Sequence, residues 1–182
     1  MWGIPYPCSG DTIDPSIFCD FSTAVDAALT TLAEQATFVQ NRPNARADRT
    51  APGNTFAVGV ATNMQLDTET FDNDGMVNLV ADSSAITIQT PGLYWATMQV
   101  GGMGPFTTWT TYRLAITQNG TSRISRKFVV VLAQATPSDQ SIYGVLVCQA
   151  GDVLRGQYTW TGSGGPQGMT RGSLSASFIC DL

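Results

Sequence analysis

The side chains that carry most enzyme chemistry are scarce in this chain. None of its 182 residues is a histidine, which excludes Ser-His-Asp catalysis, Cys-His catalysis and any histidine-ligated metal site. Glu34 and Glu69 are the only glutamates, and no carboxylate pair lies in a pocket motif such as a glycan hydrolase would use. We therefore expect a protein that is not an enzyme, with no catalytic or cofactor-binding residue. A glycan hydrolase is the alternative.

Carboxylates gather in one loop-rich stretch, at Asp67, Asp72, Asp74 and Asp82. Oxygen ligands of this kind suit calcium, but the spacing of an EF-hand is missing. We expect these acids to be solvated in loops and to bind no metal, with calcium binding as an open alternative. A further aspartate, Asp152, follows an apolar segment, and we expect it in a turn rather than in catalysis.

The four cysteines are Cys8, Cys19, Cys148 and Cys180. They form no C-x-x-C pair, which disfavours a zinc site or a redox dithiol. Cys148 and Cys180 lie on apolar segments and are expected as small buried core residues, with a disulfide between them as the alternative. Cys8 and Cys19 flank the start of a predicted helix, where an oxidising medium would allow a short disulfide staple.

Composition limits the partners of this chain. Only 13% of residues are charged, about half the usual ~25%, which suits a protein that buries much of its surface against copies or partners. The net charge is -5, and the nine basic residues are scattered, so we expect no nucleic-acid partner. No apolar stretch is long enough to span a membrane, and the first residues lack the features of a signal peptide.

A helix is predicted over residues 14–41. Asp14 suits the N-cap and Pro15 the first helical position, and Pro43 ends the segment. Its apolar residues follow spacings of 3, 4, 3, 4 and 7, which fit a heptad: Phe18, Phe21, Val25, Ala28, Leu32 and Val39. This pattern favours a short parallel trimeric coiled coil or a helix docked to a larger assembly. The alternative is an amphipathic helix packed on its own domain.

An irregular peptide precedes the helix, over residues 1–13. It carries Trp2, Ile4 and Tyr6 with no period and no local core. Side chains of this kind act as anchors when a partner buries them. We expect this peptide to attach the chain to a particle.

Residues 42–55 are polar and marked by proline and glycine, which predicts a linker. From Phe56 the apolar period changes to two, and the continuous apolar run 128–132 is typical of a strand buried on both faces. Turn signals divide the rest into about eight to ten short strands. The predicted fold is mainly β, an antiparallel jelly-roll sandwich over 56–182 with one N-terminal α-helix.

Aromatic residues flank two glycine-rich segments between the predicted strands. Phe106, Trp109 and Trp160 are candidate target-binding residues, because exposed aromatic rings there could contact a sugar or a protein. The alternative is that they cap the ends of the core.

Three short motifs occur in an order that is typical of one known family of folds. Pro91-Gly92 is followed by Tyr94, Asn119-Gly120 predicts a two-residue hairpin rather than a used glycosylation sequon, and Gly151-Asp152 follows an apolar strand. In this order and spacing, the segments resemble the globular-head domain of the first complement component and the related tumour-necrosis-factor jelly rolls. The chain departs from that pattern at Gln89, where the family usually has proline, and in its last strand.

The resemblance implies a homotrimer that binds rather than catalyses. Because no collagen-like stalk is present, the helix at 14–41 would take the trimerising role. Similar heads with N-terminal anchors occur on bacteriophage particles. We therefore expect a non-enzymatic virion protein, a capsid decoration, head fibre or minor tail protein, assembled in the bacterial cytoplasm and displayed on the virion surface.

The expected partners are further copies of the chain, other capsid or tail proteins, and a host cell-surface glycan or protein. No cofactor is expected. Two alternatives remain: a host-attachment protein of the tail tip, and a free secreted binding module.

Overall fold

The computed structural model describes residues 15–40, 42–51, 54–102, 110–130, 139–162 and 167–182. The chain forms two compact units, Met1–Asn41 and Arg42–Leu182. Residues 1–13, with the predicted anchor side chains Trp2, Ile4 and Tyr6, lie outside the described residues, as does Cys8.

The described part of the first unit is helix α1, Pro15–Gln40, which confirms the predicted helix and its proline at the first position. The side chains of Val25, Ala28 and Leu32 are exposed, and so is that of Leu29, which widens the same stripe. The other heptad side chains, Phe18, Phe21 and Val39, lie outside the described residues, as does that of Cys19. No described helix is apolar and long enough to cross a membrane.

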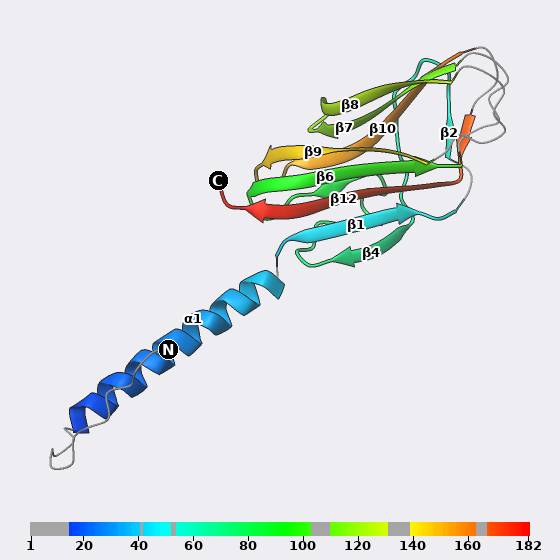
Figure 1. Cartoon of the computed structure of the whole chain (residues 1–182). Coiled ribbons are helices and arrows are strands. Elements are labelled where there is room, and N and C mark those ends of the chain that lie inside the picture. Colours follow the sequence, from blue (N-terminus) through cyan, green and yellow to red (C-terminus); the bar gives the residue numbers. More distant parts are fainter. Residues whose placement is uncertain (1–14, 41, 52–53, 103–109, 131–138, 163–166) are drawn as a thin grey trace. The chain divides into compact units, whose positions relative to one another are not determined.

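The second unit, the head, contains two five-stranded sheets (Figure 1). The first sheet has the order β4 (Thr68–Asp72), β1 (Asn44–Arg49), β12 (Arg171–Cys180), β6 (Gly92–Gly101), β9 (Gln140–Cys148). The second has the order β3 (Thr62–Asn63), β10 (Val153–Thr161), β7 (Thr110–Gln118), β8 (Thr121–Val130), with β5 (Ile86–Thr87) paired to β10. A small pair joins β2 (Asn54–Phe56) and β11 (Gln167–Met169).

All of these ladders are antiparallel, and the first and last strands of the head, β1 and β12, lie side by side. Apart from β7 and β8, which are joined by a two-residue turn, neighbours in each five-stranded sheet come from separate parts of the sequence, as in a jelly roll. The predicted mainly β, antiparallel jelly-roll fold is confirmed.

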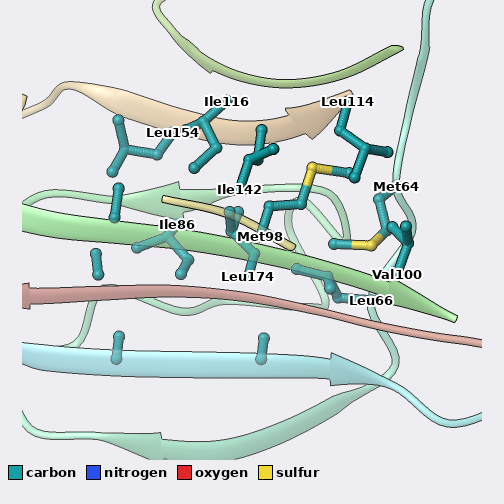
Figure 2. Packing of buried hydrophobic residues seen from close by; sticks show 14 of the residues in the cluster. Met64, Leu66, Ile86, Met98, Val100, Leu114, Ile116, Ile142, Leu154 and Leu174 are labelled. Atoms are coloured by element: carbon teal, nitrogen blue, oxygen red, sulfur yellow. The ribbon is translucent and has the colours of Figure 1, made fainter. Parts of the chain in front are cut away.

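The core lies between the two sheets and follows from the period of two. Along β6 the buried positions alternate with less buried ones, and along β10 the inward residues include Gly156, Tyr158 and Trp160. Figure 2 shows Met64 and Met98 in this core. A Cβ on Gly156 would lie 3.1 Å from the Met98 sulfur and 3.2 Å from the Met64 methyl, so the glycine lets both methionines pack against the strand.

The predicted linker 42–55 is wrong. It contains β1, whose Ala45 and Ala47 are fully buried and pair with β12, and the second unit begins at Arg42 rather than at Phe56. Alanine carries little hydrophobic signal, and the intervening charged residues hide the alternation.

The apolar run 128–132 was predicted to form a strand buried on both faces. The prediction is wrong for residues 128–130, the part of the run that the structure describes. Strand β8 ends at Val130 and is an edge strand of the second sheet. Phe128 packs against the core, but Val129 points outward and is exposed. This strand therefore carries apolar residues on both of its faces although only one face is buried.

The two described cysteines differ. Cys148 is buried and free, as predicted, whereas Cys180 is free but exposed, which corrects the prediction of a buried residue. The register between β12 and β6 shifts between Phe178 and Cys180, and this irregularity ends the inward alternation before residue 180. Burial, with the nearby Asp152 carboxylate, raises the pKa of the Cys148 thiol to about 11.

Candidate binding surfaces

The two turn motifs of the sequence meet at one end of the head. Asn119 and Gly120 both have positive φ and join Gln118 to Thr121, so the predicted two-residue hairpin is confirmed. The Asp152 carboxylate accepts hydrogen bonds from Gln118 Nε2 at 2.6 Å, Asn119 Nδ2 at 2.6 Å and the Gln149 N–H at 2.7 Å. Asp152 therefore links the turn that contains Gly151 to the β7–β8 turn.

Burial would raise the Asp152 pKa, but the hydrogen bonds from Gln149, Asn119 and Gln118 outweigh it, and the pKa is lowered. The Asn119 side chain completes the link by accepting a hydrogen bond from the Val153 N–H at 2.9 Å. The carboxylate is thus fully occupied by turn contacts. This geometry gives Asp152 the structural role that the sequence predicted.

The Pro91-Gly92-x-Tyr94 motif is also built into the fold. Pro91 is exposed, while Gly92 and Tyr94 are buried at the start of β6. A Cβ on Gly92 would lie 2.4 Å from a ring atom of Phe178, so only glycine fits there. The Tyr94 hydroxyl donates to the Thr90 carbonyl at 2.7 Å, and burial raises its pKa to about 12.

The first of the loop acids, Asp67, is a turn cap. Burial would raise its pKa, but its carboxylate accepts hydrogen bonds from the N–H groups of Ala51 and Thr50 and from the hydroxyls of Thr50 and Thr68. These bonds lower the pKa to about 2. Asp67 therefore closes the loop after β1 rather than standing free in solvent.

The other loop acids have separate structural partners. Asp72 accepts from the N–H groups of Met76 and Val77. Asp82 accepts from the Ser84 hydroxyl and, at 2.6 Å, from Arg155 on β10. Within the described ranges, no three carboxylate or thiol side chains gather as a metal site would require. Asp67, Asp72 and Asp82, which were predicted to be solvated, are in fact hydrogen-bonded caps, whereas the buried Oδ2 of Asp74 has no hydrogen-bond partner among the described residues.

The structure corrects one aromatic candidate and does not describe the others. Trp160 is only 1% exposed, because it takes an inward position on β10, and its Nε1 donates to the Phe56 carbonyl at 2.9 Å. It therefore belongs to the core and contacts no target. Phe106 and Trp109 lie outside the described residues.

A different apolar surface is exposed, on the outer side of the first sheet. It consists of the exposed Trp95 on β6, the exposed Tyr143, Val145 and Val147 on β9, and the half-buried Leu93 on β6. We refer to these five residues as the apolar face. Register places Leu93 opposite Val147 and Trp95 opposite Val145. The Trp95 and Tyr143 rings stack with centroids 5.2 Å apart, while their side chains remain 43% and 61% exposed.

Sequence reasoning identified both of these strands but not this surface. Alternation alone does not say which of two apolar sets faces the core. On β9 the inward set is Ile142, Gly144, Leu146 and Cys148, so the equally apolar alternate residues are left outside. The signal in the sequence was that successive residues of β9 are apolar, which indicates that one apolar set lies on the outer side of the sheet.

A cavity of about 260 Å³ lies near the ends of β1, β6 and β12. Its lining includes Arg46, Asp48, Arg49, Asp139 and Arg171. Arg171 holds Asp139 with two contacts of 2.8 Å, and Arg46 Nε donates to Asp48 at 2.9 Å. The charges in this cavity are therefore compensated within the chain.

Comparison with solved structures finds the fold in the globular domain of the zebrafish complement 1qA protein, with a TM-score of 0.55 and 15% sequence identity. The match covers 78% of this chain and 100% of that domain. At this identity the likeness shows the fold alone, and it confirms the complement-type jelly roll. No model of a known family matches the sequence, and neither does any curated protein.

Proposed function

We propose that this chain is a non-enzymatic protein that assembles as a homotrimer and is displayed on the surface of a bacteriophage particle. The apolar face is the observation that carries the proposal. Monomeric soluble proteins rarely expose large contiguous apolar patches, and such patches mark interaction sites. Aromatic anchors such as the stacked Trp95 and Tyr143 are typical of the centre of a protein interface.

Another copy of the chain is the partner that best fits this face. The helix carries its own exposed apolar stripe at heptad spacing, the pattern by which helices of like sequence associate. Only residues 41–43 separate Gln40 of α1 from Asn44 of β1, and this link spans about 14 Å at most. Helices that associate therefore hold their heads at high effective concentration. The number three comes from the complement-type resemblance.

The arrangement of segments supports the placement on a particle. The N-terminal peptide with Trp2, Ile4 and Tyr6 would be buried in a capsid or tail protein, and the head would face outward. Three of the acids, Asp67, Asp82 and Asp152, are occupied by turn contacts, which supports a role in binding rather than catalysis. Assembly would take place in the bacterial cytoplasm.

The interface is tested by two matched substitutions. Val145→Glu places a charge in the centre of the apolar face, and Val129→Glu places the same charge at a similarly exposed valine on β8. We expect light scattering to show the trimer lost in the first variant and kept in the second. Equal masses for both variants would contradict the assignment of the apolar face.

The proposed location on a bacteriophage particle is tested by immunogold electron microscopy with an antibody against residues 42–182. Label over heads supports a decoration protein or head fibre, and label at the tail end supports the attachment role. Particles that lack label while free protein is present in the lysate would replace the virion proposal with a free binding module.

A further inference from the structure

Four of the nine basic residues lie on the β7–β8 hairpin: Arg113, Arg123, Arg126 and Lys127. All four are exposed. The basic residues were predicted to be scattered, and for these four the fold corrects that prediction. The signal in the sequence was the absence of any Asp or Glu over residues 83–138.

These cations differ from four other arginines of the head. Arg46, Arg49, Arg155 and Arg171 each lie within 4.0 Å of an aspartate. None of the four hairpin cations makes an ion pair within the described part of the chain. Arg123 lies close enough to Asp152 for its charge to help lower the pKa of that carboxylate. In a chain of net charge -5, the positive charge that remains without a described carboxylate partner is that of Arg113, Arg126 and Lys127.

Two of the cations face each other across the strands. Register places Arg113 directly opposite Lys127, on the outer side of the second sheet, because the neighbouring Tyr112 and Leu114 are buried. Like charges in this position destabilise a sheet. Charges on an edge strand such as β8 can prevent aggregation, but β7 lies inside the sheet between β10 and β8. Edge protection therefore does not account for Arg113.

The surroundings of Arg113 supply further hydrogen-bonding groups. Its Nη2 donates to the hydroxyls of Ser122 at 3.2 Å and Ser125 at 2.9 Å, which hold the guanidinium along the sheet. On the neighbouring strand, Thr159 is its register partner. We refer to Arg113, Lys127, Ser122, Ser125 and Thr159 as the cationic face.

We propose that the cationic face binds an anionic glycan, a polysaccharide that carries phosphate or carboxylate groups. Guanidinium and ammonium groups make charge-assisted hydrogen bonds with such anions, and the serine and threonine hydroxyls suit the sugar hydroxyls between them. Single-stranded nucleic acids bind through aromatic stacking platforms, but the nearby Tyr112 is on the core side.

The location of the cationic face is compatible with self-association. Because the alternate residues of these strands are buried between the sheets, the apolar face lies on the outer side of the first sheet and the cationic face on the outer side of the second. Figure 1 shows the strands of the two sheets. Copies packed on the first sheet would leave the second open to a glycan. A glycan would be a partner for the proposed binding head. The glycan site depends on neither the trimer nor the particle, so the glycan proposal can fail while the proposed function holds, and the reverse.

The test measures binding of the full chain to poly(glycerol phosphate), to polygalacturonate and to neutral dextran at low and high salt. We expect one or both polyanions to bind, dextran not to bind, and salt to weaken binding. Binding to poly(glycerol phosphate) alone identifies phosphate as the anion, and binding to polygalacturonate alone identifies carboxylate. Failure of both polyanions to bind would overturn the inference, as would equal binding to dextran or tighter binding to single-stranded DNA.

Matched variants locate the site. Arg113→Gln with Lys127→Gln should weaken the Kd about tenfold, whereas Arg46→Gln with Arg171→Gln removes the same charge from ion-paired residues and should change it less than about twofold. Equal weakening in both double variants would overturn the inference, because net charge alone would then explain binding. Lys127→Gln alone, which removes no hydrogen bond given above, should still weaken binding if the double variant does not fold.

Discussion

Replacement of Asp152 by alanine tests how the two turns hold the end of the head together. The change removes the acceptor for Gln118 Nε2, Asn119 Nδ2 and the Gln149 N–H. A hydrogen bond to a charged group contributes about 1.5–3 kcal/mol when it is shielded from water, and Asp152 is only partly buried. Gln118 also keeps its bond to the Val147 carbonyl at 2.9 Å, so it is not left without an acceptor.

We therefore expect Asp152→Ala to lower the free energy of unfolding by about 2–3 kcal/mol, less than the sum of three shielded bonds. The assay is urea denaturation followed by tryptophan fluorescence, with all chains at one concentration because association adds to apparent stability. Asp181→Ala is the matched control, since Asp181 is exposed near the end of the last strand. A loss below about 0.5 kcal/mol for Asp152→Ala would refute the reasoning.

The same substitution has a pH signature. The pKa of Asp152 is lowered in the folded head relative to about 3.9 in an unfolded chain. A depressed pKa contributes stability that is present above the unfolded value and is lost as pH falls through the folded value. Asp152→Ala should therefore lose less stability than the unaltered chain on acidification below about pH 4. Parallel pH profiles would contradict the assigned role.

Further predictions concern the core. Tyr158 has a buried hydroxyl with no partner among the described residues, so Tyr158→Phe should leave the urea midpoint unchanged or raise it, whereas Tyr94→Phe should cost about 1 kcal/mol by removing the bond to Thr90. A loss in Tyr158→Phe equal to that in Tyr94→Phe would contradict this. Gly156→Ala should destabilise the head by about 1–3 kcal/mol, because the added methyl crowds Met64 and Met98, and an unchanged midpoint would show that the methionines yield. Because burial raises the pKa of the Cys148 thiol to about 11, a maleimide at neutral pH should label Cys180 in the native protein and Cys148 only after denaturation. Peptide mapping identifies the labelled cysteines, and labelling of Cys148 in the native protein would contradict its burial.

Local sequence signals predicted the parts of this fold that depend on local chemistry. Proline at the first helical position and the Asn119-Gly120 pair act within a few residues, and both elements occur as expected. Strand β1 was missed because Ala45 and Ala47 are buried by neighbours far along the chain rather than by their own hydrophobicity. Cys180 was misplaced because a register irregularity between strands leaves no trace in a single sequence.

The candidate surfaces depend on pairing between strands and were less predictable. Trp160 precedes a glycine-rich segment in the same way that an exposed aromatic residue would, yet its inward position on β10 places it in the core. Arg113 and Lys127 are neighbours only through the register of the hairpin. The apolar face likewise needs the decision about which side of β9 faces the second sheet, and that decision is made by the packing of the whole sandwich.

The mass of the full chain in solution tests the central claim most directly, that the apolar face and the helix join copies of this protein. Light scattering at micromolar concentration should give about 58 kDa, three times the 19.4 kDa of one chain. A mass of 19.4 kDa would contradict the account, because the apolar face and the helix stripe would then remain exposed to water.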